Sequence, residues 1–165
     1  TLSHCHLLYF VKGKRATTFN ATAVKVPSAR QMLYRDKRAA HGGRLPDDTW
    51  VLQPQWLPDA FCSGEDTWCV SRVCGTFKER TGTPNQLPEP ILGRIINLCS
   101  NPGDYVFDPM VGSGTTLAVA KKLGRLYGGF ELSAEYAKLA NNRIQAAQPN
   151  QPLAGAAPQG ELESA

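Results

Sequence analysis

Two carboxylates and two glycines lie in an order that suits the binding of a nucleoside. Asp108 ends a short apolar stretch, and Gly112 and Gly114 follow it closely. Glycines let the backbone approach a ligand and leave its amide groups facing that ligand. Glu131 follows the next apolar stretch, where a carboxylate can accept hydrogen bonds from both hydroxyls of a ribose. The spacing therefore predicts a site for a nucleotide-type cofactor.

The residues after this loop narrow the choice of cofactor. A dinucleotide-binding loop usually carries a third glycine near the start of its helix, but residues 115–117 read Thr-Thr-Leu. This absence disfavours a dehydrogenase. The loop also lacks the Gly-Lys-Ser/Thr ending of an ATP phosphate loop. We therefore expect a ligand that contains adenosine without phosphates.

The elements that must position these residues follow from hydrophobic spacing. We expect, in chain order, a helix of about 10 residues opening at Pro88, a strand over 105–107, a helix over 117–123, a strand over 125–132 and a helix over 134–146. Hydroxyls should cap the two later helices, those of Thr115 and Thr116 for the first and that of Ser133 for the second. Strand, glycine loop, helix and strand in this order form half of a Rossmann-type unit.

The regions on either side differ from this unit in composition and in hydrophobic pattern. Residues 4–12, with the sequence HCHLLYFVK, are dense enough in apolar side chains to predict a strand buried on both faces. Residues 13–80 are broken by proline and glycine into short, irregular pieces. Residues 148–165 are rich in Pro, Gly, Ala and Gln, a composition that predicts a disordered tail.

Positive charge is concentrated in residues 11–44, which we call the basic segment. It holds nine basic residues and one acid, a net charge of +8, whereas the whole chain carries only +4. Such segregation of charge is typical of proteins that dock on a polyanion. The alternatives are a merely solvated basic face and internal salt bridges with the acidic remainder of the chain.

Composition argues against several other classes of protein. No apolar stretch approaches the roughly 18 residues of a membrane span, and the first residues lack the basic start of a signal peptide. We therefore expect a cytoplasmic protein. The five cysteines are irregularly spaced without a Cys-x-x-Cys pair, so we expect reduced thiols and no metal site.

The glycine loop and its surroundings match one known family. The loop reads Asp108-Pro109-Met110-Val111-Gly112-Ser113-Gly114-Thr115-Thr116. It resembles the Asp-Pro-Phe-x-Gly-Ser-Gly-Thr-Thr motif of prokaryotic DNA amino-methyltransferases, which modify adenine N6 or cytosine N4 with S-adenosylmethionine. The likeness covers roughly residues 4–147. It includes Gln86-Leu87-Pro88-Glu89, Pro102-Gly103-Asp104, Tyr34-x-Asp36-x-Arg38 and Pro46-Asp47-Asp48-x-Trp50.

This resemblance implies an α/β fold, a partial Rossmann-like methyltransferase sheet with a loop-rich target-recognition insert. The expected regions are a sheet strand in 1–12, the insert in 13–82, the S-adenosylmethionine-binding region in 83–147 and the tail in 148–165. The implied cofactor contacts are Asn85, Gln86, Asp108, Pro109, Met110, Gly112, Ser113, Gly114, Thr115, Thr116, Glu131 and Leu132. Met110 stands where the family usually has Phe, and Thr83 where a His is frequent.

The family's catalytic tetrapeptide, Asp/Asn/Ser-Pro-Pro-aromatic, has no counterpart here, because the sequence contains no Pro-Pro pair. In the permuted β-type order this tetrapeptide comes first, and the sequence starts after it. We therefore assign no catalytic residue and expect no methyl transfer by this chain alone. A separate chain or an upstream segment would supply the tetrapeptide. The alternative is a non-catalytic DNA-binding remnant or a pseudo-methyltransferase.

Double-stranded DNA is the partner that both the basic segment and the resemblance imply. Exposed arginine and lysine bind phosphates, and interleaved amide or aromatic side chains can reach base edges. The residues that we expect to contact DNA are Arg30, Gln31, Tyr34, Arg35, Lys37 and Arg38.

Overall fold

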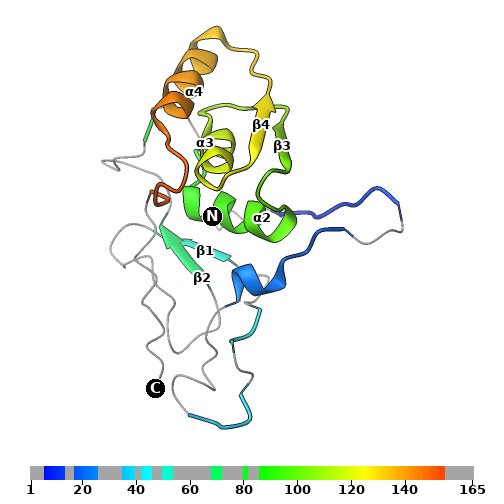
Figure 1. Ribbon diagram of the computed structural model, residues 1–165. Helices are drawn as coiled ribbons and strands as arrows, with labels where there is room; N and C mark the ends of the chain where they lie inside the picture. Colours follow the sequence, from blue (N-terminus) through cyan, green and yellow to red (C-terminus); the bar gives the residue numbers. More distant parts are fainter. Residues whose placement is uncertain are drawn as a thin grey trace.

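The computed structural model describes residues 6–13, 17–25, 35–39, 42–45, 50–53, 68–71, 80–81 and 86–154. Its elements in chain order are the 3-10 helix η1 (Ala21–Val24), strands β1 (Trp50–Gln53) and β2 (Trp68–Ser71), helix α2 (Glu89–Cys99), strand β3 (Tyr105–Asp108), helix α3 (Thr115–Lys122), strand β4 (Leu126–Gly129) and helix α4 (Ala134–Ala146). Figure 1 shows α2, α3 and α4 gathered around β3 and β4.

The α/β unit is built on two parallel strands joined through α3. Tyr105 pairs with Leu126 and Asp108 with Gly129, so both strands end together at one edge. Parallel strands need a crossover connection, and α3 provides it. The expected helix–strand–loop–helix–strand–helix order is confirmed, and the last helix has the predicted bounds.

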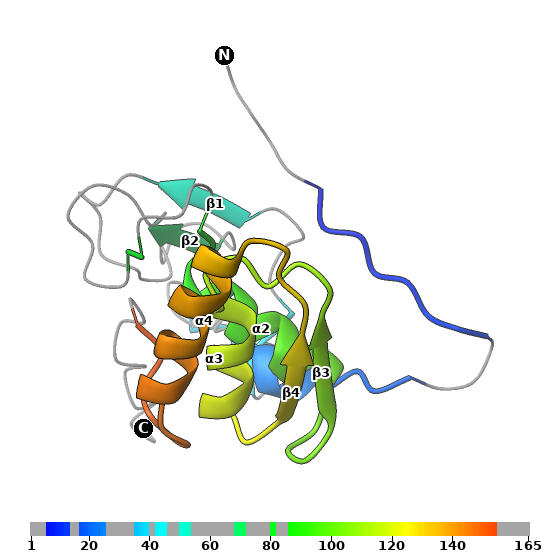
Figure 2. The ribbon, with the colours of Figure 1, turned by 90° about the horizontal axis from the view of Figure 1, so that it is seen from above.

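The core of this unit lies between α3 and its neighbours. Ala118, Val119 and Ala120 are completely buried, because α3 contacts β3, β4, α2 and α4. Small side chains on α3 allow this close approach from several sides. Leu92 and Ile96 of α2 complete one buried cluster. The three helices lie on one side of β3 and β4 in Figure 2.

The C-terminal residues correct one prediction. Residues 148–154 were expected to begin a disordered tail, but the structure describes them, and although 148–152 are exposed, Leu153 and Ala154 are partly buried against the α/β unit. Leu153 joins the cluster around Leu92 and Ile96, and the Asn150 amide donates to the Lys122 carbonyl at 2.8 Å. An apolar contact and several hydrogen bonds thus hold a segment whose composition suggests disorder. Residues 155–165 lie outside the described residues.

The N-terminal residues correct a second prediction. Residues 6–13, the described part of the strand expected over 4–12, form no strand. Leu8 and Phe10 are 70% and 83% exposed, and the segment runs away from the helices in Figure 2. A strand needs a neighbour that accepts its backbone hydrogen bonds and covers its apolar faces. Within the described residues, no strand pairs with this segment.

The region expected to be irregular contains regular pieces. Strands β1 and β2 pair in parallel, from Trp50 with Trp68 to Gln53 with Ser71. The stretch around η1 is tied to α2, since the Asn20 amide donates to the Leu98 carbonyl at 2.7 Å. Arg94 of α2 donates in turn to the Val24 carbonyl at 3.0 Å. In the part of the chain that the structure describes, no helix has the length and apolarity to span a bilayer.

Candidate cofactor site

The glycine loop begins where β3 ends. The Asp108 carboxylate accepts from the Met110 amide at 2.9 Å and so turns the chain sharply. Beyond the turn, the Val111 amide donates to the Phe130 carbonyl at 2.9 Å. This bond continues the pairing of β3 and β4 past the formal strand ends. The loop is therefore held against the segment that follows β4.

Glu131 is bound directly to the loop, although 19 residues separate it from Gly112. One carboxylate oxygen accepts from the Gly112 amide at 2.7 Å, and the other accepts from the Ser133 amide at 2.9 Å. These hydrogen bonds, with that from Ser133 the larger effect, lower the pKa of Glu131 below its ordinary value. The side chain is therefore a carboxylate at neutral pH. The structure brings together the acid and the glycine that the sequence singled out.

Two glycines make this geometry feasible. Gly114 has a φ of +78°, and a Cβ there would lie 2.9 Å from the Cα of Ala140 in α4. Gly129 faces the Asp108 carbonyl so closely that a side chain has no room. The loop thus depends on glycine both for backbone conformation and for the approach of its neighbours.

The hydroxyls after the loop do not cap α3, which corrects the prediction made for Thr115 and Thr116. Gly114 occupies the N-cap position, and no side chain caps the helix. Thr115 is already helical, and its buried hydroxyl lies 3.0 Å from that of Ser113 and accepts from Arg143 at 2.7 Å. The predicted Ser133 cap of α4 is confirmed by its hydrogen bond from the Tyr136 amide.

Three large apolar residues next to the loop or to Glu131 in the sequence are exposed, and the ring of one of them, Phe130, lies edge-on to that of Phe107 with centroids 5.6 Å apart. Met110, Phe130 and Leu132 are 81%, 71% and 102% exposed. Exposed apolar side chains are available for contact with a ligand or with another segment. Phe130 was not among the predicted site residues. Its position immediately before Glu131 in the sequence is the feature from which its place near the site could have been predicted.

The other predicted cofactor residues are distributed as follows. Pro109 is exposed in the loop, and Thr116 lies on the first turn of α3. Gln86 is buried, and its side-chain oxygen accepts from the amide and hydroxyl of Thr81, which turns it toward the preceding segment. Asn85 lies outside the described residues.

Half of the residues expected to contact DNA are described. Arg38 is 82% exposed, and its guanidinium holds the Asp36 carboxylate with two hydrogen bonds of 3.1 Å. This local pair accounts for the single acid of the basic segment. Arg35 has a left-handed φ of +46°, next to this turn, and Lys37 is within it. Arg30, Gln31 and Tyr34 lie outside the described residues.

Comparison with known proteins identifies the family. Residues 1–142 match the N6/N4 methyltransferase family described as DNA methylase. Type II methyltransferase M.HpaI of Haemophilus parainfluenzae is 33% identical over 86% of this chain and 38% of its own length. Type II methyltransferase M2.DpnII of Streptococcus pneumoniae is 44% identical over 50% of this chain and 31% of its own length.

A solved structure of an M1.HpyAVI-SAM complex is 30% identical, covers 58% of this chain and 44% of its own, and superposes with a TM-score of 0.43. The chain spans about a third of the length of the named relatives. The match over residues 1–142 shows that the chain belongs to the N6/N4 DNA methylase family.

Proposed function

We propose that this chain is the cofactor-binding and DNA-recognition portion of a site-specific DNA methyltransferase. The methyl group would pass from S-adenosylmethionine to an exocyclic amino group of adenine or cytosine. The observation that supports the proposal is the hydrogen bond between Glu131 and the Gly112 amide, because an acid suited to accept ribose hydroxyls lies beside the glycine loop.

The residues present fit an adenosyl ligand without phosphates. A carboxylate has about four acceptor positions, and the backbone amides of Gly112, Ser133 and Leu132 all interact with that of Glu131. The position that is left can receive a ribose hydroxyl. The exposed Met110, Phe130 and Leu132 offer apolar surface for an adenine ring. These features support a nucleoside-binding role for the site.

Electrostatics favours a sulfonium ligand over a diphosphate. Glu131 is negatively charged, and it accepts a hydrogen bond from the Gly112 amide, the kind of backbone donor that binds a phosphate in a glycine loop. A diphosphate there would face a like charge, whereas a sulfonium would face an opposite one. When bound, S-adenosylmethionine supplies an activated methyl group. The chain's own residues would hold the ribose, cover the adenine and keep the loop in place.

Calorimetry with S-adenosylmethionine tests this assignment. We expect the folded chain to bind it, and Glu131→Gln to bind it at least about tenfold more weakly, since a charged acceptor is lost. ATP and NAD serve as competitors and should not displace it. The assignment fails if the folded wild-type chain shows no binding, or if NAD binds in its place.

We further propose that the chain needs another segment for methyl transfer. Its sequence has no Pro-Pro pair, and so no counterpart of the catalytic tetrapeptide. The face of β3 and β4 opposite the helices leaves Tyr105, Phe107 and Leu126 52–62% exposed. In the complete protein or complex, a segment that carries the tetrapeptide would cover this face. Methylation of DNA by the isolated chain with labelled cofactor would contradict the proposal.

The second candidate, a non-catalytic DNA-binding remnant, is favoured by the charge of the basic segment. Both candidates predict DNA binding through the exposed cations, and cofactor affinity separates them. A chain that binds DNA but not S-adenosylmethionine is the remnant. A chain that binds both is the methyltransferase portion.

A further inference from the structure

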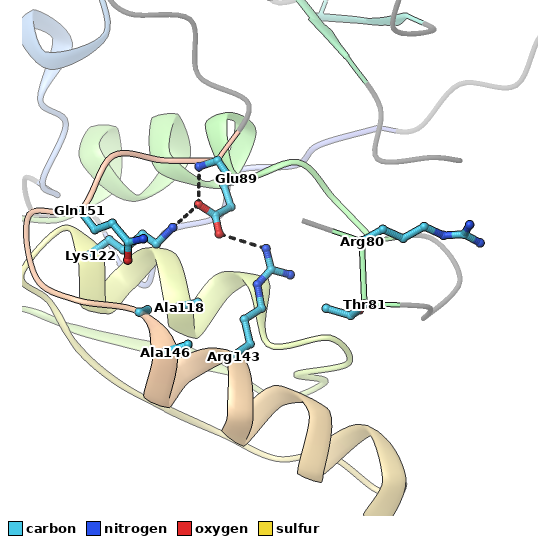
Figure 3. Close-up of a pocket in the computed structure, with 10 residues that line it drawn as sticks. Arg80, Thr81, Glu89, Ala118, Lys122, Arg143, Ala146 and Gln151 are labelled. Atoms are coloured by element: carbon cyan, nitrogen blue, oxygen red, sulfur yellow. Dashed lines mark hydrogen bonds and ion pairs between the residues drawn. The ribbon is translucent and has the colours of Figure 1, made fainter. Parts of the chain in front are cut away.

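A buried chain of hydrogen bonds runs from the start of α2 to the middle of the glycine loop. One oxygen of Glu89 accepts from Arg143 of α4 at 3.0 Å. A second nitrogen of the same guanidinium donates to the Thr115 hydroxyl at 2.7 Å, and this hydroxyl lies 3.0 Å from that of Ser113. Figure 3 shows Arg143 rising from α4 to meet Glu89.

The members of this chain are shielded from water. The side chains of Glu89 and Arg143 are 4% and 12% exposed, and Thr115 and Ser113 are buried as well. A buried hydroxyl or charge is costly unless it is paired, so each group constrains the position of its partner. Arginine suits this place because its planar fork can donate to two acceptors in different directions.

The second oxygen of Glu89 binds a different cation, Lys122, whose contacts can be compared with those of Arg143. It accepts from Lys122 at 2.7 Å and from the Ala154 amide at 2.7 Å. Lys122 also reaches the Pro152 carbonyl at 3.4 Å, so its contacts lead to the C-terminal segment. Burial by itself raises the pKa of Glu89, but the hydrogen bonds of Lys122, Ala154 and Arg143 lower it overall. Two cations therefore hold one carboxylate, and only Arg143 continues to the loop.

We propose that Arg143 is a positioning residue for the cofactor loop. Held by Glu89, its guanidinium fixes Thr115 and through it Ser113, the residue between Gly112 and Gly114. Both glycines have a positive φ and gain conformational freedom if this anchor is lost. The anchor thereby keeps the Gly112 amide on Glu131 before any ligand arrives. The expected effect of Arg143 on cofactor affinity rests on the function proposed above, whereas its effect on the loop does not.

Arg143→Met and Lys122→Met form the matched pair that tests this role. Each removes one cation from Glu89 and leaves the other, so both should lower the melting temperature. Amide hydrogen exchange by NMR, without cofactor, reports the loop. We expect Arg143→Met to speed exchange at Gly112 and Gly114 by about tenfold or more, and Lys122→Met to leave it near the wild-type rate. Binding of S-adenosylmethionine should weaken about tenfold in Arg143→Met alone.

Equal loop exchange in the two variants would overturn the proposal, because Arg143 would then act only through general stability. If Arg143→Met does not fold, Thr115→Val and Thr115→Ser replace it. Valine keeps the shape but removes the hydroxyl, so only valine should speed exchange at Gly112. If the wild-type chain binds no S-adenosylmethionine, the proposed function fails, and the exchange measurement still decides the role of Arg143.

Discussion

Replacing Gly114 with alanine tests the close packing of the cofactor loop on α4. The backbone of Gly114 is left-handed, which costs an alanine about 1–2 kcal/mol. The new Cβ would also lie 2.9 Å from both Cα and Cβ of Ala140 and 3.2 Å from its carbonyl oxygen. Backbone atoms cannot yield as a flexible side chain can, and such overpacking costs about 1–3 kcal/mol more. We expect Gly114→Ala to lower the free energy of unfolding by about 2–5 kcal/mol.

Gly124→Ala is the matched control. Gly124 follows α3 with a φ of +72°, but a Cβ there meets no atom within 4 Å. It should therefore show only the backbone cost of about 1–2 kcal/mol. Urea unfolding, followed by the helical signal at 222 nm, measures both variants against the wild type. Equal losses in the two variants would refute the close approach of the loop and α4.

Three other perturbations follow from the structure. Because the pKa of Glu131 is lowered in the folded chain, its stabilising effect is present above the ordinary value of 4.5 and is lost as the pH falls below it. Between about pH 5 and pH 3, a range that brackets the ordinary pKa of glutamate, the melting temperature should fall less in Glu131→Gln than in the wild type. Parallel curves of melting temperature against pH would contradict this. Leu153→Ala should cost about 1–2 kcal/mol in urea unfolding, since a partly buried leucine leaves the core cluster; an unchanged midpoint would mean that residues 148–154 contribute no packing. Affinity for duplex DNA should fall steeply with salt concentration, and Arg38→Gln should make that slope shallower by about one unit if Arg38 contacts a phosphate. An affinity that is insensitive to salt would exclude the basic segment as a DNA contact.

Local sequence was sufficient to determine the order of elements in the α/β unit. Ser133 before a helical pattern predicted the start of α4, and its hydroxyl caps that helix. Glycine positions likewise marked the loop between β3 and α3, because positive φ angles are strongly selective for glycine. Capping and turn formation depend on groups a few residues apart. The Ser133 cap could therefore be predicted without knowledge of the fold, whereas the contacts of Thr115 could not.

Contacts across long sequence separations were decided only by tertiary structure. The sequence placed Glu131 at the end of a strand, but only the parallel pairing of β3 and β4 brings its carboxylate to the Gly112 amide. Leu153 is a second example of a contact that the sequence could not predict. Composition assigned it to a disordered tail, whereas in the structure it packs on an apolar surface formed by distant residues. Thr115 was expected to cap α3 and instead meets Arg143, which lies 28 residues later.

The physical reason is the range of the forces involved. A cap or a turn is stabilised by its own neighbours, whereas a buried charge such as Glu89 is stable only where partners from distant elements converge. Residues 6–13 illustrate the converse, since their apolar side chains suit a strand, but a strand forms only beside another strand. Sequence by itself thus determined which residues bear the chemistry and which local shapes they adopt. Tertiary packing decided which of them touch.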